Sequence, residues 1–136
     1  MTFEKQGPHN TEAALKLAIE AAREEGIHKI VVASSTGATA KKLAELEHEG
    51  IRIIDVGYAR GVFGKHEPKM SDEMRQDLEA MGVTVYVASH ALSGAERGLS
   101  SKLGGFGPVE VAAHALRIIG RGVKVCVEIS MMAADA

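Results

Sequence analysis

The segment from Ile30 to Thr39 reads Ile-Val-Val-Ala-Ser-Ser-Thr-Gly-Ala-Thr, an apolar run followed by hydroxyl side chains around one glycine. A helical pattern, Ala-Lys-Lys-Leu-Ala-Glu-Leu, begins at once with Ala40. A buried strand that turns through a loop of small residues into a helix is the basic unit of a parallel α/β fold. The first N–H groups of such a helix are unpaired, and the loop is therefore a candidate site for an anion.

The same pattern recurs along the chain, as a glycine, a β-branched residue and a short apolar run. It begins at Gly26, Gly50, Gly82 and Gly122. Each glycine can adopt the left-handed conformation that ends a helix, and each run is typical of a strand covered on both faces. The chain is therefore predicted to form a three-layer α/β/α sandwich with a mostly parallel sheet, in a single domain over residues 1–136.

Capping residues and apolar spacing place the helices between these strands. The first predicted helix begins after Asn10 or Thr11, the second spans about Ala38 to His48, and the third begins after the cap Ser71. A fourth covers about Ala95 to Leu103, and a fifth begins at Pro108. In the last of them, an apolar stripe is expected to face the core and comprises Val111, Ala112, Ala115, Leu116 and Ile119.

Composition and charge exclude several classes of function. The formal net charge is −2, which gives no electrostatic basis for binding nucleic acid or an anionic membrane. The sequence has neither a long apolar segment nor a signal core, and we expect a cytoplasmic protein. Cys126 is the single cysteine, which rules out an internal disulfide, and it is expected to be a small buried residue of the fourth strand.

The strongest candidate for a binding site is the loop after the first strand. Hydroxyls and N–H groups around a helix start can hold a phosphate or carboxylate. The alternative is an ordinary α/β turn in which one hydroxyl caps the next helix, although four hydroxyls exceed what one cap requires. The loop matches neither the Walker nor the dinucleotide signature. The predicted anion-binding residues are Ser34, Ser35, Thr36, Gly37, Ala38 and Thr39.

A second group of polar residues follows the third strand. His90 comes directly after the strand end, where an imidazole can contact a ligand or carry a proton. Arg97 and Lys102 could supply positive charge to an anionic ligand. The alternative is a solvated helix whose charges have only surface partners. We predict that His90, Arg97 and Lys102 form the wall opposite the loop.

Two further features are less specific. Residues 57–70 form a long, glycine-rich connection that is either a cover for the ligand or a plain surface loop, and its candidate residues are Tyr58, Arg60, Lys65 and His66. Glu128 lies in the fourth apolar run and needs a cationic partner if it is buried, for which an Arg or Lys of the second group is expected. The six histidines lack metal-ligand spacing, and no metal site is predicted.

Five segments together resemble pyruvate kinase C-terminal-domain-like proteins, above all a small stand-alone family, chiefly archaeal. They are Asn-Thr-Glu-Ala-Ala-Leu-Lys-Leu-Ala from Asn10, Val-Val-Ala-Ser-Ser-Thr-Gly-Ala-Thr-Ala from Val31, Ser-His-Ala-Leu-Ser-Gly-Ala-Glu-Arg from Ser89, Ser-Lys-Leu-Gly-Gly from Ser101, and Val-Cys-Val-Glu-Ile-Ser-Met-Met-Ala-Ala-Asp from Val125. They follow in order over nearly the whole chain.

The resemblance implies a ligand but no kinase activity, because the catalytic barrel of pyruvate kinase is absent. In that enzyme the corresponding loop binds the phosphate of a sugar-phosphate effector. By this resemblance, the matching loop positions here are Ser34, Thr36, Gly37 and Thr39. The stand-alone proteins resemble binders of flavin mononucleotide (FMN). The expected ligand is therefore a phosphorylated small molecule, FMN above all, and the alternative is a non-catalytic module that senses a sugar phosphate or nucleotide. Relatives continue with two more strands, so the chain is expected to be either truncated or naturally short, and in both cases the open sheet edge predicts a homo-oligomer.

Overall fold

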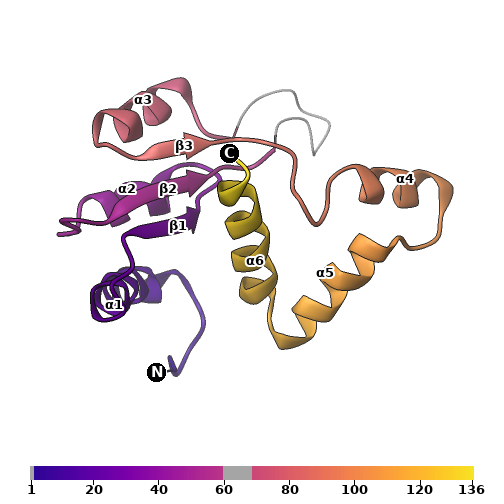
Figure 1. Cartoon of the computed structure of the whole chain (residues 1–136), viewed down its shortest axis with the longest axis horizontal. Coiled ribbons are helices and arrows are strands. Elements are labelled where there is room, and N and C mark those ends of the chain that lie inside the picture. The colour runs from indigo at the N-terminus through magenta and orange to yellow at the C-terminus, as the bar shows by residue number, and fades with distance from the viewer. Residues whose placement is uncertain (1, 60–68) are drawn as a thin grey trace.

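A computed structural model describes residues 2–59 and 69–136 of the chain, with the three predicted strands in one sheet (Figure 1). The strands are β1 (Lys29–Ala33), β2 (Arg52–Val56) and β3 (Thr84–Tyr86). They are parallel, and their order in the sheet is β1-β2-β3. In the register, Asp55 of the central strand lies between Val32 and Val85.

The helices lie on both faces of this sheet and beyond it. They are α1 (Thr11–Glu24), α2 (Ala38–Ala44), α3 (Asp72–Ala80), α4 (Ala95–Leu103), α5 (Pro108–Ile119) and α6 (Arg121–Ala134), and a 3-10 turn, η1 (Pro8–Asn10), precedes α1. The α2 helix ends earlier than predicted. Ser71 caps α3 as expected, because its hydroxyl accepts a hydrogen bond of 3.2 Å from the N–H of Met74.

Two glycines, Gly26 and Gly82, end a helix in the predicted way, whereas Gly50 lies in a turn six residues after the end of α2. Gly26, Gly50 and Gly82 have φ angles of 64°, 77° and 81°, which are left-handed conformations that favour glycine. Each of them is followed within three residues by a strand of the sheet. The repeated glycine pattern therefore identified three real strand entries.

The main core lies between the sheet and the first three helices. It contains Leu15 and Ile19 of α1, Ala40 and Leu43 of α2, and Leu78 of α3, together with sheet residues such as Ile53. The two side chains of α1 are four positions apart and the two of α2 are three apart, which is the spacing of one helical face. Their burial holds α1, α2 and α3 against one face of the sheet.

The second face of the sheet is covered by α6. Ile129 and Met132 pack with Val56, and the partly buried Val31 and Tyr86 adjoin them. Along β1, Val31 belongs to this cluster while Ile30 and Val32 face the main core, as the alternation of side chains along a strand requires. The fold is therefore an α/β/α sandwich with a parallel sheet, in agreement with the sequence.

The predicted fourth strand is wrong, because residues 121–134 form the helix α6. The alternating valines Val123, Val125 and Val127 suggested a strand, but each is partly exposed. The buried residues of α6 are Lys124, Glu128, Ile129 and Met132, whose spacing of four, one and three positions defines a helical face. Cys126 is exposed rather than buried, since it lies off this face.

Helices α4 and α5 stand away from the sheet, and α6 connects them back to it (Figure 1). The predicted buried stripe of α5 is therefore wrong: only Ala113 is buried in this helix, and Ile118 and Ile119 are 87% and 75% exposed. Residues 87–94 lead from β3 to α4. Helices α4 and α5, called the arm below, border a hollow beside the sheet. None of the described helices is both long enough and apolar enough to span a membrane.

Candidate functional site

A cavity of about 780 Å³ lies between the arm and the carboxyl edge of the sheet. Tyr58 follows β2 and His90 follows β3, and both line it. The remaining wall comes from α4, α5 and α6, including Arg97 and Arg121. In parallel α/β proteins, ligands bind at this edge of the sheet. The size of the cavity is within the usual range for small-molecule sites.

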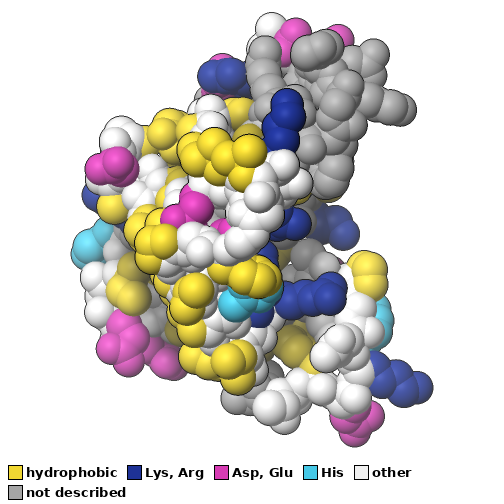
Figure 2. All heavy atoms as spheres, turned by 90° about the vertical axis from the view of Figure 1, so that its right-hand side faces the viewer, with side chains coloured by type: hydrophobic (Ala, Val, Ile, Leu, Met, Phe, Trp, Pro, Cys, Tyr) yellow, Lys and Arg dark blue, Asp and Glu magenta, His cyan; other side chains and the backbone are white. Residues whose placement is uncertain are grey.

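Positive charge predominates in the wall of this cavity. The cations that line it are Arg97 of α4, Arg117 of α5, and Arg121 and Lys124 of α6; the imidazole rings of His90 and His114 line it as well. The acidic residues that line it are Glu110 and Glu128. Figure 2 looks onto the side of the molecule that carries α4 and α5, and shows basic side chains gathered on it beside apolar ones. Arginines in such a wall can bind a phosphate or carboxylate with two hydrogen bonds each.

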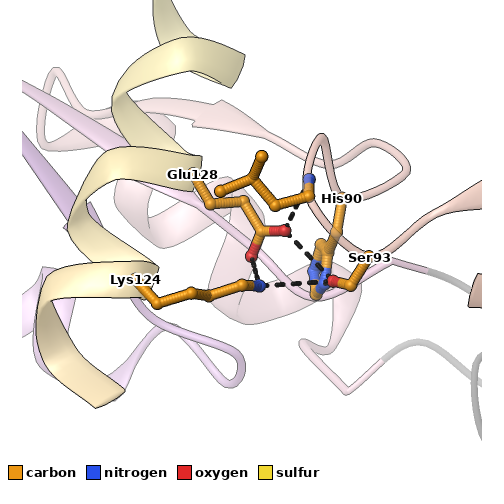
Figure 3. A network of polar contacts seen from close by, with 5 residues as sticks. His90, Ser93, Lys124 and Glu128 are labelled. Atoms are coloured by element: carbon orange, nitrogen blue, oxygen red, sulfur yellow. Dashed lines mark hydrogen bonds and ion pairs between the residues drawn. The ribbon is translucent and has the colours of Figure 1, made fainter. Parts of the chain in front are cut away.

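The negative charge of Glu128 is balanced by the positive charge of Lys124 at the back of the cavity (Figure 3). Its Oε2 accepts a hydrogen bond of 2.5 Å from Lys124 Nζ, and its Oε1 accepts bonds of 2.9 Å from the N–H of Leu92 and 3.0 Å from the hydroxyl of Ser93. Burial would raise the pKa of Glu128, but these hydrogen bonds outweigh it and hold the pKa below its usual value. The carboxylate is therefore ionised and fully engaged.

The predicted partner of Glu128 is wrong in its position. The cation comes from the same helix, one turn earlier, rather than from Arg97 or Lys102. Lys124 and Glu128 are four residues apart. On a helix this spacing brings the two side chains together, whereas in a strand they would share a face but lie far apart along it. The incorrect strand assignment concealed this pair.

His90 is held in the same network. Its Nδ1 lies 3.5 Å from Ser93 Oγ, and its ring meets that of Tyr58 edge to face, with centroids 4.8 Å apart. Burial lowers the pKa of His90; the negative charge of Glu128 opposes this shift and the positive charge of Lys124 adds to it. His90 is therefore a neutral imidazole at neutral pH.

The start of α5 is tied to α4 by the carboxylate of Glu96. This side chain accepts a hydrogen bond of 2.8 Å from the N–H of Glu110, in the first turn of α5. It crosses directly over Gly107, where a Cβ atom would lie only 2.0 Å from Glu96 Cδ. The link fixes the angle between two helices that carry Arg97 and Arg117, and so it shapes the cavity.

The predicted anion loop does not line this cavity. The hydroxyl of Ser34 is buried and accepts a hydrogen bond of 3.0 Å from the N–H of Thr39, and the carbonyl of Ser34 accepts one of 3.4 Å from the N–H of Gly37. Gly37 packs so tightly beneath α3 that a Cβ would lie 2.5 Å from Met74 Cγ. Two of the N–H groups expected to bind an anion are thus already paired within the loop. Among the described residues, the N–H groups of Thr36 and Ala38 have no such acceptor.

The hollow beside the loop is small. It is lined by Ser35, Tyr58 and Lys69, among others, and has a volume of about 20 Å³. That is about enough for one water molecule and too small for a phosphate. Tyr58 lines both the hollow and the large cavity. The two parts of the predicted site are therefore neighbours on either side of one tyrosine.

The large cavity brings together some of the predicted residues and several unpredicted ones. His90 and Arg97 line it, whereas Lys102 is exposed and does not. Arg60, Lys65 and His66 lie outside the described residues. The cavity is also lined by Arg117, Arg121 and Lys124, which are not among the site residues predicted from the sequence. Their spacing of four and three positions across Gly120 was the available signal.

One polar residue of the sheet has no evident role in this cavity. Asp55 of β2 is completely buried, and neither of its carboxylate oxygens has a hydrogen-bond partner in the described part of the chain. Burial raises its pKa to about 7, and the nearby N–H of Ser34 partly opposes the shift. Asp55 lies on the face of the sheet that is covered by α1, α2 and α3.

The described residues include no cluster of three or more His, Cys, Asp or Glu that could hold a metal ion. A family model described as pyruvate kinase, alpha/beta domain, matches residues 12–135. The match takes in all six α-helices and all three strands, apart from the first residue of α1.

Proposed function

The chain belongs to the pyruvate kinase α/β-domain family, and we propose that this member binds a phosphorylated small molecule in the cavity between α4, α5 and α6. The observation that carries the proposal is the set of arginines, Arg97, Arg117 and Arg121, that line one cavity in which one of the two lining carboxylates, Glu128, is already paired with Lys124. A phosphate group supplies the compensating charge and accepts hydrogen bonds from several guanidinium groups at once.

We propose that the phosphate lies at the corner between α5 and α6. Arg117 and Arg121 are four residues apart on either side of Gly120, and Lys124 follows one turn later. The loop Ser34–Thr39 is the competing position, supported by its hydroxyls and by the resemblance to the effector loop of pyruvate kinase. The size of the adjoining hollow, about 20 Å³, favours the corner.

FMN is the ligand that we propose first. The resemblance to the stand-alone family points to it, and the cavity offers both chemistries that it requires. Tyr58, His90 and Phe106 supply aromatic rings for a flavin, and the arginines supply donors for its phosphate. Any redox chemistry would belong to the flavin, while the protein would position it and set its electrostatic surroundings. Among the described residues, no group is assigned as a catalytic acid or base.

A titration with FMN tests the proposal. We expect saturable quenching of flavin fluorescence and a higher melting temperature with bound ligand. Arg121→Gln should weaken binding by about tenfold or more, because one charge-assisted hydrogen bond is lost. Arg52→Gln is the matched control, since Arg52 is exposed at the start of β2 and does not line the cavity. Equal binding by both variants would refute the placement of the phosphate.

A non-catalytic sensing module is the second candidate. The observation that favours it is the exposed pair Ile118 and Ile119, which lies between Arg117 and Arg121 in the sequence. In a homo-oligomer, contacts through these residues would couple ligand occupancy to assembly. Protein purified from a cell that is yellow, with absorbance at about 450 nm, would favour the flavin. Colourless protein that melts higher with sugar phosphates, but not with FMN, would favour the sensor.

A further inference from the structure

The direction of the hydrogen bonds around Ser93 is determined by the charges of its neighbours (Figure 3). Lysine can only donate, and an ionised carboxylate can only accept. Ser93 Oγ lies 3.3 Å from Lys124 Nζ and 3.0 Å from Glu128 Oε1. A hydroxyl has one proton, and the shorter, charge-assisted bond to Glu128 takes it. Ser93 therefore donates to Glu128 and accepts from Lys124.

This arrangement leaves Ser93 with no proton for His90. The hydroxyl oxygen still has a lone pair, and it lies 3.5 Å from His90 Nδ1. If Nδ1 were bare, two lone pairs would face each other in a partly buried setting. A proton on Nδ1 instead completes the chain, with His90 as the donor and Ser93 as the acceptor. The position of this proton follows from the partners of each group.

Among the described residues, the other groups around His90 leave its second nitrogen without a partner. The described groups that face the ring are Tyr58, which meets it edge to face, and the polar chain of Ser93, Lys124 and Glu128. Burial disfavours a second proton on the ring and, with the positive charge of Lys124, outweighs the negative charge of Glu128, so that the pKa of His90 is lowered. Within the described part of the chain, His90 Nε2 makes no hydrogen bond.

We infer that His90 presents Nε2 as a hydrogen-bond acceptor to the cavity, and that the ligand carries a hydroxyl or N–H donor in addition to its phosphate. The second part rests on the proposed function. The arginines and Lys124 of the wall can only donate, which suits a phosphate. A fully ionised phosphate has no proton to give, so the group that meets Nε2 is a separate donor. Phosphorylated polyols, sugars and flavins have such a donor apart from the phosphate; inorganic phosphate has none apart from its own P–OH.

The first test needs no ligand. Two-bond ¹H–¹⁵N correlation spectra distinguish the imidazole tautomers, and the signals of His90 are those that disappear in His90→Phe. At a pH above its pKa, we expect His90 with the proton on Nδ1. Ser93→Ala should remove this preference, and Ser93→Thr should restore it, because Ser93 acts as a positioning residue. A proton on Nε2 in the wild-type protein would overturn the inference.

The second test compares two probes, FMN and inorganic phosphate. His90→Phe keeps a ring against Tyr58 and removes the acceptor, and it should weaken FMN binding by about three- to tenfold. It should leave the binding of inorganic phosphate unchanged. His28→Phe is the matched control, since His28 is exposed and lies outside the cavity.

The outcomes separate this inference from the proposed function. Equal loss of both probes in His90→Phe would mean that His90 only shapes the cavity, and it would overturn the inference alone. A wild-type protein that binds neither probe would overturn the proposed function and the ligand donor together. In that case the tautomer would still be decided by the spectra.

Discussion

Lys124 Nζ and Glu128 Oε2 lie 2.5 Å apart at the back of the cavity, and each side chain is more than nine-tenths buried. A second pair with the same spacing of four residues, Arg75 and Glu79, lies at 2.8 Å on the surface of α3. The two pairs have the same sequence geometry but very different surroundings. The buried pair also holds the turn after β3 against α6, through Leu92 and Ser93.

Glu128→Ala should therefore destabilise the fold strongly. It leaves the ammonium group of Lys124 buried without a counter-charge and the N–H of Leu92 without its acceptor. We therefore expect a loss of about 3–5 kcal/mol in the free energy of unfolding. Urea unfolding at neutral pH measures it. Glu79→Ala should cost less than about 1 kcal/mol, because its pair is solvated. Similar losses in the two variants would contradict the burial of the inner pair.

Replacing both partners of the buried pair should be milder than removing one. Lys124→Met combined with Glu128→Leu leaves no buried charge, and such exchanges are often close to neutral. We expect the double variant to unfold at a higher urea concentration than Glu128→Ala. A double variant that is less stable than Glu128→Ala would mean that the pair supplies a large net stabilisation.

Sequence reasoning succeeded where local rules and tertiary structure agree. At Gly26 and Gly82, a helix end in the left-handed conformation precedes a short apolar strand, and at Gly50 a left-handed turn does so; these features leave a clear signature. The helix α4 was predicted with its observed bounds, Ala95–Leu103. Together, these elements were sufficient to predict the α/β class and the parallel sheet.

The prediction failed where one pattern fits two structures. The valines at 123, 125 and 127 alternate as in a strand, while Lys124, Glu128 and Met132 recur every four residues as in a helix. Periodicity over a short apolar run cannot separate the two, and the β-branched valines weighted the choice toward a strand. Once this segment was assigned to a strand, Lys124 and Glu128 were not recognised as partners of each other, although their pairing identifies the helix.

The site was only half predictable for a related reason. Arg97 and His90 follow a strand end, where chemistry is expected, and both line the cavity. The prediction packed α5 on the sheet, and in such a sandwich Arg117 and Arg121 would lie on the solvated outer side. The way in which α5 stands away from the sheet depends on side-chain contacts such as that of Glu96 with the start of α5. Such contacts leave no periodic signal in the sequence.

Asp55 should make the stability of the protein fall as the pH rises. Its pKa is about 7 in the folded protein and 3.8 as its ordinary value, so the unfolded chain loses this proton first. The stabilisation is complete below about pH 4 and is lost as the pH rises through about 7, for a total of roughly 4 kcal/mol. Asp55→Asn keeps the shape and cannot ionise. Urea unfolding at pH 5 and pH 8 should show that the variant lacks this part of the pH dependence.

The matched control for Asp55 is Asp77→Asn. Asp77 is exposed and pairs with Lys41 at 3.1 Å, and its replacement should leave the difference between pH 5 and pH 8 as in the wild type. Comparing each variant with the wild type removes the pH dependence that the two proteins share. Parallel behaviour of Asp55→Asn and the wild type would show that the carboxyl finds a partner that keeps its pKa near the ordinary value.

The position of the phosphate can be decided with one pair of variants. Thr36→Val removes a hydroxyl from the loop, and Arg117→Gln removes a charge from the corner between α5 and α6. If the phosphate lies at the corner, Arg117→Gln weakens FMN binding by about tenfold or more and Thr36→Val leaves it unchanged. Isothermal titration calorimetry measures both. The reverse pattern, with a loss of about 1–3 kcal/mol in Thr36→Val, would assign the phosphate to the loop.

Gly107→Ala should loosen the joint between α4 and α5. The new Cβ would occupy the place of the Glu96 carboxylate, and the side chain would have to leave the N–H of Glu110. Loss of a cap of this kind costs about 1 kcal/mol, and we expect that decrease in the free energy of unfolding. In the background of Glu96→Ala, the same change should cost much less, because there is no cap left to displace.

Gly98→Ala is the control of opposite sign. Gly98 lies inside α4, and a Cβ there would meet nothing within 4 Å, so alanine should stabilise the helix by about 0.5–1 kcal/mol. Urea unfolding of the two glycine variants, with and without Glu96, measures the coupling directly. Equal costs of Gly107→Ala in both backgrounds would mean that the glycine matters for its backbone alone, and that Glu96 does not hold α5 in place.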